Sequence, residues 1–239
     1  MLHNEVIHTS KWAITKRCGE MIKKFYLFNN IPKIQKEVNL LRLSTQLNVR
    51  LYFDHKSANW VAEVPYLRLH PLFDGRNTHD TLEQLRNIFD MWEYDRRYCA
   101  LVSNDWEPMA KPYFINLLTQ YLTASSELGA YLSVQKADHF IHGDFRLSNV
   151  LRDRCERIVV LDFENAMIGP RLWDETTLVY NLIEEHQYEL AMEVFDSFHC
   201  PWMMLLTIAG IRLAQSRKKS LDDSSRMKAY EFILNHSKP

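Results

Sequence analysis

The chain has 239 residues, of which 46% are hydrophobic and 12% aromatic, enough to bury a sizeable core. Its formal net charge at pH 7 is −1, so it has no excess of positive charge for binding nucleic acid or anionic lipid. We therefore expect a globular protein without nucleic-acid or membrane partners.

Two further features bear on the compartment in which the chain works. The longest apolar run, 202–211, is too short to span a bilayer, and the first residues lack the basic and apolar regions of a signal peptide. The four cysteines, Cys18, Cys99, Cys155 and Cys200, are far apart and show no zinc-ligand spacing. We interpret them as reduced thiols and expect a cytoplasmic location.

The N-terminal part of the chain has the pattern of short strands around one helix. Alternating and β-branched residues predict strands at 6–8, 12–15, 21–26, 49–53 and 60–64. Pro32 opens a run with helical spacing over 33–43. Pro65 ends the last strand, because proline cannot donate a hydrogen bond to a neighbouring strand.

From residue 78 the hydrophobic pattern becomes helical. Apolar residues at helical spacing predict helices over 80–92, 113–132, 176–198, 202–217 and 222–235. A loop is expected at 104–108. The second part of the chain should therefore be mainly α-helical.

A polar motif lies between these helices. A His-Gly-Asp tripeptide ends at Asp144 and is followed after four residues by Asn149, and a short β-branched run, 158–161, leads into Asp162. Phosphoryl transfer needs a carboxylate to accept the proton of the acceptor hydroxyl, and oxygen ligands to hold Mg²⁺. Asp144, Asn149 and Asp162 supply these groups, and we expect them to converge.

This motif, with the Asp-Phe-Glu tripeptide at 162–164, resembles the catalytic and metal loops of aminoglycoside phosphotransferases and choline kinases, which are relatives of protein kinases. Protein kinases carry His-Arg-Asp and Asp-Phe-Gly at these places, so Gly143 and Glu164 point to the small-molecule branch. The resemblance implies an α+β, two-lobed protein-kinase-like fold. A small antiparallel β-sheet lobe with one helix would occupy 1–66, and a larger, mainly helical lobe 67–239.

The resemblance also implies roles for single residues. Asp144 would be the catalytic base, Asn149 and Asp162 the Mg²⁺ ligands, and His142 a scaffold for the loop. Asp174 stands where family members carry an aspartate that steadies the catalytic loop. A helix N-cap explains Asp174 equally well.

In the resembling fold the third strand carries a lysine that contacts the nucleotide phosphates. Lys23 is the better candidate, with Lys24 facing the other side of the strand, and Glu37 on the following helix would be its ion-pair partner. The alternatives are an ordinary strand lysine and a solvated glutamate. Backbone groups near Glu63 to Tyr66 would hydrogen-bond adenine.

One departure concerns the phosphate-covering loop, which is often glycine-rich in kinase-like proteins, whereas here no glycine precedes Gly19. The segment 9–12 would have to do this work. Ser10 and Thr9 could offer hydroxyl and backbone N–H donors, and Lys11 a charge. The departure keeps a second hypothesis open, a pseudokinase or nucleotide-binding regulatory module without transfer activity.

The expected reaction is ATP- and Mg²⁺-dependent transfer of the γ-phosphoryl group to a hydroxyl of a small molecule, such as an amino sugar, aminoglycoside, choline-like amine or sugar. Trp173, Tyr180 and Trp202 lie among acidic residues and could hold a cationic acceptor, or could simply belong to the core. Arg146 could instead anchor an anionic group or the transferring phosphate. Only ten residues separate Asp162 from Trp173, which leaves no activation segment and disfavours a protein acceptor.

Overall fold

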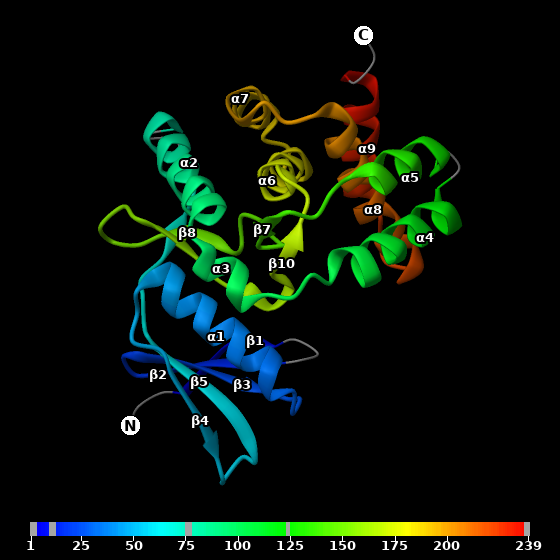
Figure 1. Ribbon diagram of the computed structural model, residues 1–239. Helices are drawn as coiled ribbons and strands as arrows, with labels where there is room; N and C mark the ends of the chain where they lie inside the picture. Colours follow the sequence, from blue (N-terminus) through cyan, green and yellow to red (C-terminus); the bar gives the residue numbers. More distant parts are fainter. Residues whose placement is uncertain (1–3, 10–12, 75–77, 123–124, 237–239) are drawn as a thin grey trace. The chain divides into compact units, whose positions relative to one another are not determined.

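The computed structural model describes residues 4–9, 13–74, 78–122 and 125–236 (Figure 1). The chain forms two compact units. The first unit comprises Met1–Asp74 and Ser148–Asn165, and the second comprises Gly75–Leu147 and Ala166–Pro239.

The first unit contains a five-stranded antiparallel sheet with the strand order β1-β2-β3-β5-β4. The strands are β1 (Asn4–Thr9), β2 (Ala13–Cys18), β3 (Met21–Tyr26), β4 (Arg50–Asp54) and β5 (Asn59–Pro65). Helix α1 (Ile31–Thr45) lies along one face of this sheet (Figure 1). The expected small antiparallel sheet with one helix is therefore confirmed.

Local sequence signals determine where α1 begins. The side chain of Asn30 accepts a hydrogen bond from the Lys33 N–H at 3.1 Å, which satisfies one of the donors left open at a helix start. Pro32 suits the first turn, because its missing N–H would have had no partner in the helix. The Asn30 cap starts the helix at Ile31, two residues before the expected position.

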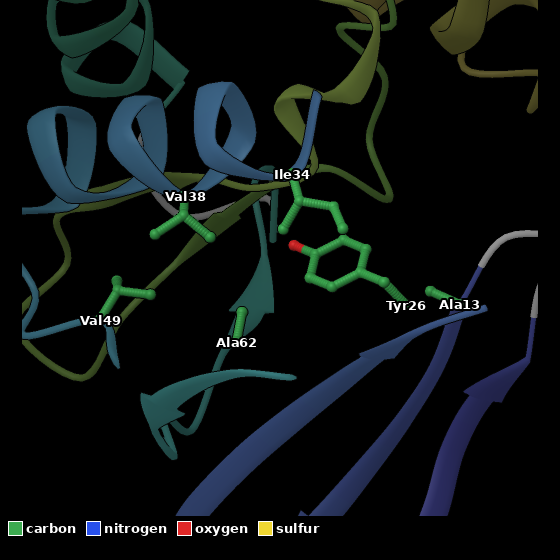
Figure 2. Close-up of a cluster of buried hydrophobic side chains, with 6 residues drawn as sticks. All are labelled: Ala13, Tyr26, Ile34, Val38, Val49 and Ala62. Atoms are coloured by element: carbon green, nitrogen blue, oxygen red, sulfur yellow. The ribbon is translucent and has the colours of Figure 1, made fainter. Parts of the chain in front are cut away.

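A buried apolar cluster joins α1 to the sheet (Figure 2). Its members are Ala13, Tyr26, Ile34, Val38, Val49 and Ala62. Tyr26 of β3 points toward α1 (Figure 2). Because side chains alternate along a strand, Lys24 shares the face of Tyr26, and Lys23 lies on the opposite face. The packing of α1 thus decides which of the two lysines faces the helix.

The first unit also contains a three-stranded sheet with the order β6-β8-β9. The strands are β6 (His70–Pro71), β8 (Val150–Arg152) and β9 (Ile158–Val160), and β9 matches the expected buried strand. Buried Arg152 donates its Nε–H to the Leu72 carbonyl at 2.9 Å. These contacts draw 148–165 into the first unit, so this unit does not follow the expected boundary at residue 66.

The second unit is mainly helical, as expected. Its helices are α2 (Thr78–Tyr94), α3 (Arg96–Leu101), α4 (Lys111–Tyr121), α5 (Ser125–Val134), α6 (Trp173–Glu184), α7 (Tyr188–Phe198), α8 (Trp202–Lys218) and α9 (Ser224–His236). Strands β7 (His139–Ile141) and β10 (Met167–Gly169) form an antiparallel pair. No helix among the described residues has the length and apolar character needed to cross a membrane.

Three expectations about the helical part are wrong. The helix expected over 176–198 is divided into α6 and α7, which are separated by residues 185–187. The single helix expected over 113–132 is divided into α4 and α5, because Leu122 takes an extended conformation at the end of α4. The loop expected at 104–108 contains the start of a π-helical turn, Trp106–Ala110. Trp106 is buried against Trp173, with ring centroids 4.8 Å apart, and this packing stabilises an ordered turn.

Candidate active site

Lys24 of β3 bridges two carboxylates in the first unit. Its Nζ lies 2.6 Å from Glu37 Oε1 and 2.9 Å from Asp162 Oδ1. Burial alone would lower the pKa of Lys24, but the negative charges of Glu37 and Asp162 outweigh it and raise this pKa above its usual value. Lys24 is therefore a stable cation at neutral pH, held between α1 and the residue that follows β9.

The expected pair of Lys23 with Glu37 is wrong. Lys23 Nζ lies 3.0 Å from Glu63 Oε1 and donates to the Tyr52 hydroxyl at 3.3 Å. The pattern of β3 did not separate the two lysines, because apolar residues occur on both of its faces. Glu37 is only 5% exposed, so the alternative of a solvated glutamate is wrong as well.

The other residues expected to bind the nucleotide are only partly described. Ser10 lies outside the described residues. The Tyr66 N–H donates to the Glu20 carbonyl at 2.8 Å, and the Arg17 guanidinium lies 3.9 Å from the centre of the Tyr66 ring. The Tyr66 amide is thus already used by the turn between β2 and β3. Nucleotide contacts of Ser10, Glu63 and Tyr66 stay predictions.

The β8–β9 hairpin places Asn149 and Asp162 at its same end. The hairpin pairs Val150 with Val160, and beyond this pair the Leu161 N–H donates to the Asn149 carbonyl at 2.8 Å. Asp162 follows with a φ of 62°, in the left-handed region that aspartate tolerates better than most residues. Two residues thirteen positions apart in sequence are thereby brought together at the open end of the hairpin.

Three carboxylates of the first unit form a group that can hold a divalent cation. Glu37, Asp162 and Glu164 each bring one oxygen within 4.8 Å of the others. Hard cations such as Mg²⁺ prefer oxygen ligands, so the chemistry of this donor set fits the expected metal. Glu164 was not among the expected ligands, although its tripeptide with Asp162 was the signal for the family resemblance.

Asp144 lies in the second unit between two arginines. It is 6% exposed, and Arg146 donates its Nε–H to Asp144 Oδ2 at 3.0 Å and its Nη2–H to the same oxygen. Arg212 of α8 donates its Nη2–H to Asp144 Oδ1 at 2.9 Å. Burial alone would raise the pKa of Asp144, but the charges of Arg212 and Arg146 outweigh burial and lower it. Asp144 is therefore a carboxylate at neutral pH.

Sequence reasoning missed Arg212, which reaches Asp144 from 68 positions away. A signal was present, because Arg212 directly follows the long apolar run 202–211. A charged residue within the pattern of a buried helix needs a partner, because an unpaired buried charge is costly. The pattern did not reveal that the partner is Asp144.

Asp174 holds the loop that carries Asp144. Its carboxylate accepts the backbone N–H groups of His142 at 2.5 Å and Gly143 at 3.0 Å. The N-cap of α6 is Leu172, which makes no side-chain capping bond. The expected contact of Asp174 with the loop is confirmed, and the capping alternative is wrong.

His142 is buried beneath the same loop. Its ring stacks on Trp92 with centroids 6.4 Å apart and 13° between the planes, and its Nδ1 accepts the Asp144 N–H at 3.3 Å. Gly143 has a φ of 79°, which a residue with a Cβ adopts only with strain. This placement suits His142 to a scaffolding role, as the resemblance implies.

The contacts of Asp174 lead to a prediction about stability. Asp174→Ala should lower the free energy of unfolding by about 2–5 kcal/mol, because the buried amide of His142 and the partly buried amide of Gly143 lose their acceptor. The urea unfolding midpoint, compared with that of Asp196→Ala, measures the effect. Asp196 is exposed on α7, and its replacement should change stability by less than about 0.5 kcal/mol. Equal midpoints for the two variants would show that Asp174 does not stabilise the loop.

Asp144 belongs to the second unit, and Asn149 and Asp162 belong to the first. The convergence of the three side chains around one ion therefore stays a prediction. Each unit by itself nevertheless assembles a charged group from residues that are distant in the sequence.

Comparisons with known proteins show the family and the fold of this chain. Residues 7–203 match the family model described as "Phosphotransferase enzyme family". A search of curated proteins found no match. Among solved structures, a thermostable mutant of aminoglycoside phosphotransferase APH(4)-Ia in ternary complex with AMP-PNP and hygromycin B is 14% identical, with 99% of this chain and 95% of that chain covered and a TM-score of 0.66.

Two other solved structures are similar. Choline kinase LicA from Streptococcus pneumoniae is 12% identical, with 98% of this chain and 92% of that chain covered and a TM-score of 0.57. Amicoumacin kinase hAmiN, in complex with AMP-PNP, Ca²⁺ and Ami, is 10% identical, with 97% of this chain and 86% of that chain covered and a TM-score of 0.61. At such identities the likeness shows a common fold. Because the family match spans most of the chain and includes both the loop at 142–149 and Asp162, the chain belongs to the phosphotransferase enzyme family.

Proposed function

We propose that this protein transfers the γ-phosphoryl group of ATP, in the presence of Mg²⁺, to a hydroxyl group of a small molecule. The observation that carries the proposal is the bridge of Lys24 between Glu37 and Asp162 in a chain of the phosphotransferase family. Two similar structures are complexes with AMP-PNP, and one of these also contains Ca²⁺. These ligands support a nucleotide and a divalent cation for the present chain.

In this proposal Lys24 takes the phosphate-binding role first expected of Lys23. Its ammonium group is fixed by Glu37 and can donate to the nucleotide phosphates without losing its charge. Asp162, Asn149 and Glu164 would hold Mg²⁺. When bound, the ion neutralises negative charge on the phosphates that are being separated.

Asp144 is proposed to orient the acceptor hydroxyl and to accept its proton as the γ-phosphoryl group is transferred. Its lowered pKa makes it a weak base, but a loose phosphoryl-transfer transition state depends mostly on positioning and charge. Arg146 and Arg212 donate three hydrogen bonds to Asp144, which fix the orientation of its carboxylate.

The test is ADP release from ATP in the presence of a panel of small alcohols. We expect removal of divalent ions with EDTA to reduce ADP release to background, and added Mg²⁺ to restore it, because the carboxylates of the first unit need a cation to accommodate a triphosphate. A control titration should show that EDTA leaves the unfolding temperature of the nucleotide-free protein unchanged. Turnover that persists without divalent ions would reject the magnesium-dependent mechanism.

One observation favours a second candidate, a nucleotide-binding module without transfer activity. Both oxygens of Asp144 accept hydrogen bonds from arginines, and a base held in this way could be inactive. Such a module would raise its unfolding temperature with MgATP but would leave the nucleotide intact. Chromatography of the bound nucleotide after incubation separates the two candidates.

A further inference from the structure

We infer that the acceptor carries an anionic group, a carboxylate or a phosphate, next to the hydroxyl that is phosphorylated. This inference rests on the proposed transferase function and names its substrate class. The geometry that carries it is the arrangement of Arg146 and Arg212 around Asp144 in the second unit.

The first argument is the local charge. One carboxylate, Asp144, is contacted directly by two guanidinium groups, which leaves one positive charge in excess. The Arg146 side chain is 44% exposed and that of Arg212 is 22% exposed, so both can be reached from solvent. An acceptor hydroxyl bound to Asp144 therefore lies in a positive environment. An anionic group on the acceptor would be attracted there, and an ammonium group repelled.

The second argument is the number of donors that remain. A guanidinium group has five N–H donors in a planar fork that matches carboxylate and phosphate oxygens. Within the described residues, Arg146 uses its Nε and Nη2 on Asp144, and Arg212 uses its Nη2. The donors that are left can bind an anionic ligand while the contacts to Asp144 persist.

The third argument is the position of Arg212 itself. It lies on α8, where residues 204–211 are all buried, and its carbonyl accepts the Arg226 Nη1–H at 3.1 Å. Placing a charged group in such a helix costs solvation energy. Arg212 helps to offset the cost of burying Asp144, but this pairing uses only one Nη2–H of Arg212. Its other N–H donors, on a side chain that is 22% exposed, remain available for a ligand.

The residues that could have formed a cationic acceptor site are engaged elsewhere in the second unit. Trp173 and Tyr180 are buried in the core, and the Trp202 ring packs on Phe195 with centroids 4.4 Å apart. Among the acidic residues, Glu184 Oε1 lies 3.0 Å from Arg226 Nε. The cation–π site considered from the sequence therefore lacks exposed rings from Trp173 and Tyr180.

The first experiment compares acceptors that share a three-carbon skeleton. ADP release by the full chain would be measured at saturating MgATP with glycerate, glycerol 3-phosphate, glycerol and 3-amino-1,2-propanediol. We expect at least one of the two anions to exceed the amine in kcat/KM by about tenfold or more, with glycerol in between. The anion with the higher kcat/KM shows whether the acceptor carries a carboxylate or a phosphate group. An amine that equals or exceeds both anions would overturn the inference.

The second experiment tests Arg212 directly. Arg212→Gln should lower kcat/KM for the preferred anion by about 100-fold, as expected for the loss of a charged partner, but that for glycerol by less than about tenfold. Arg212→Lys should restore part of the preference, because it keeps the charge. Arg97→Gln is the matched control, since Arg97 forms an exposed pair with Asp95.

The outcomes separate the inference from the proposed function. An equal loss with all acceptors in Arg212→Gln would mean that Arg212 only positions Asp144, and would overturn the inference while leaving the transferase intact. Absence of any MgATP turnover in the unaltered protein, with or without acceptors, would reject both. Turnover that favours the amine would reject the anionic acceptor alone.

Discussion

Replacing Asp144 by asparagine should lower kcat by about 10²–10⁴-fold, the range usual for loss of a positioned general base. An amide of the same shape keeps one acceptor oxygen, so it can accept from Arg146 or from Arg212 but not from both, and it cannot take the proton of the acceptor hydroxyl. ADP release at saturating MgATP and acceptor measures the loss. Binding of MgATP, followed by thermal shift, should change little, because we place Asp144 at the acceptor.

The control for this variant is Asp95→Asn. Asp95 also pairs with an arginine, Arg97, and it caps α3 in the same unit. The control should keep its activity although it too loses an aspartate–arginine pair. Asp144→Asn removes a buried charge, so near-ultraviolet circular dichroism should verify that the variant is folded. A folded variant that retains more than about one tenth of kcat would reject Asp144 as the base.

The second large effect is expected at β3, where two adjacent lysines differ in their surroundings. Lys24→Met should lower kcat by about 10²–10³-fold. This is the usual loss when an enzyme is deprived of one hydrogen-bond donor that stabilises the charge of the transition state. The substitution should also weaken MgATP binding, because Glu37 and Asp162 lose the cation between them. Lys23→Met is the matched control, since it removes the same charge one position away.

Lys23 pairs with Glu63 and Tyr52, at a surface salt bridge that contributes little to stability. The Lys23 variant should therefore keep kcat and KM for ATP within about threefold of the unaltered protein, which corresponds to less than 1 kcal/mol. Initial rates over a range of ATP concentrations give both constants. A larger loss in Lys23→Met than in Lys24→Met would return the phosphate-binding role to Lys23.

The fold could largely be predicted, because its signals are local. Alternating residues defined the strands of the small sheet, and helical spacing defined most helices of the second unit. The predictions from the sequence failed where tertiary packing, and not the local hydrophobic pattern, determines the structure. Burial of Trp106 against Trp173 orders a turn that polar residues had suggested was a loop. The pairing of β6 with β8 adds 148–165 to a unit that was expected to end at residue 66.

In the candidate site, too, some residues could be selected from the local sequence, whereas others are known only from their tertiary contacts. Asp144, Asn149 and Asp162 could be selected from the sequence, because their spacing and the short apolar strand before Asp162 are properties of neighbouring residues. Their assigned roles belong to the resemblance and to the proposal. The residues that contact Asp144 and Glu37 could not be selected in this way.

The sequence by itself determined the succession of strands and helices, the loop around Asp144 and the family resemblance, because each depends on residues close together along the chain. Tertiary structure decided that Lys24 faces α1, that Arg212 reaches Asp144, and that Asp174 holds the loop. Each of these contacts joins side chains that are distant in sequence. Their choice depends on which face of a strand or helix becomes buried, and that is settled only when the elements pack.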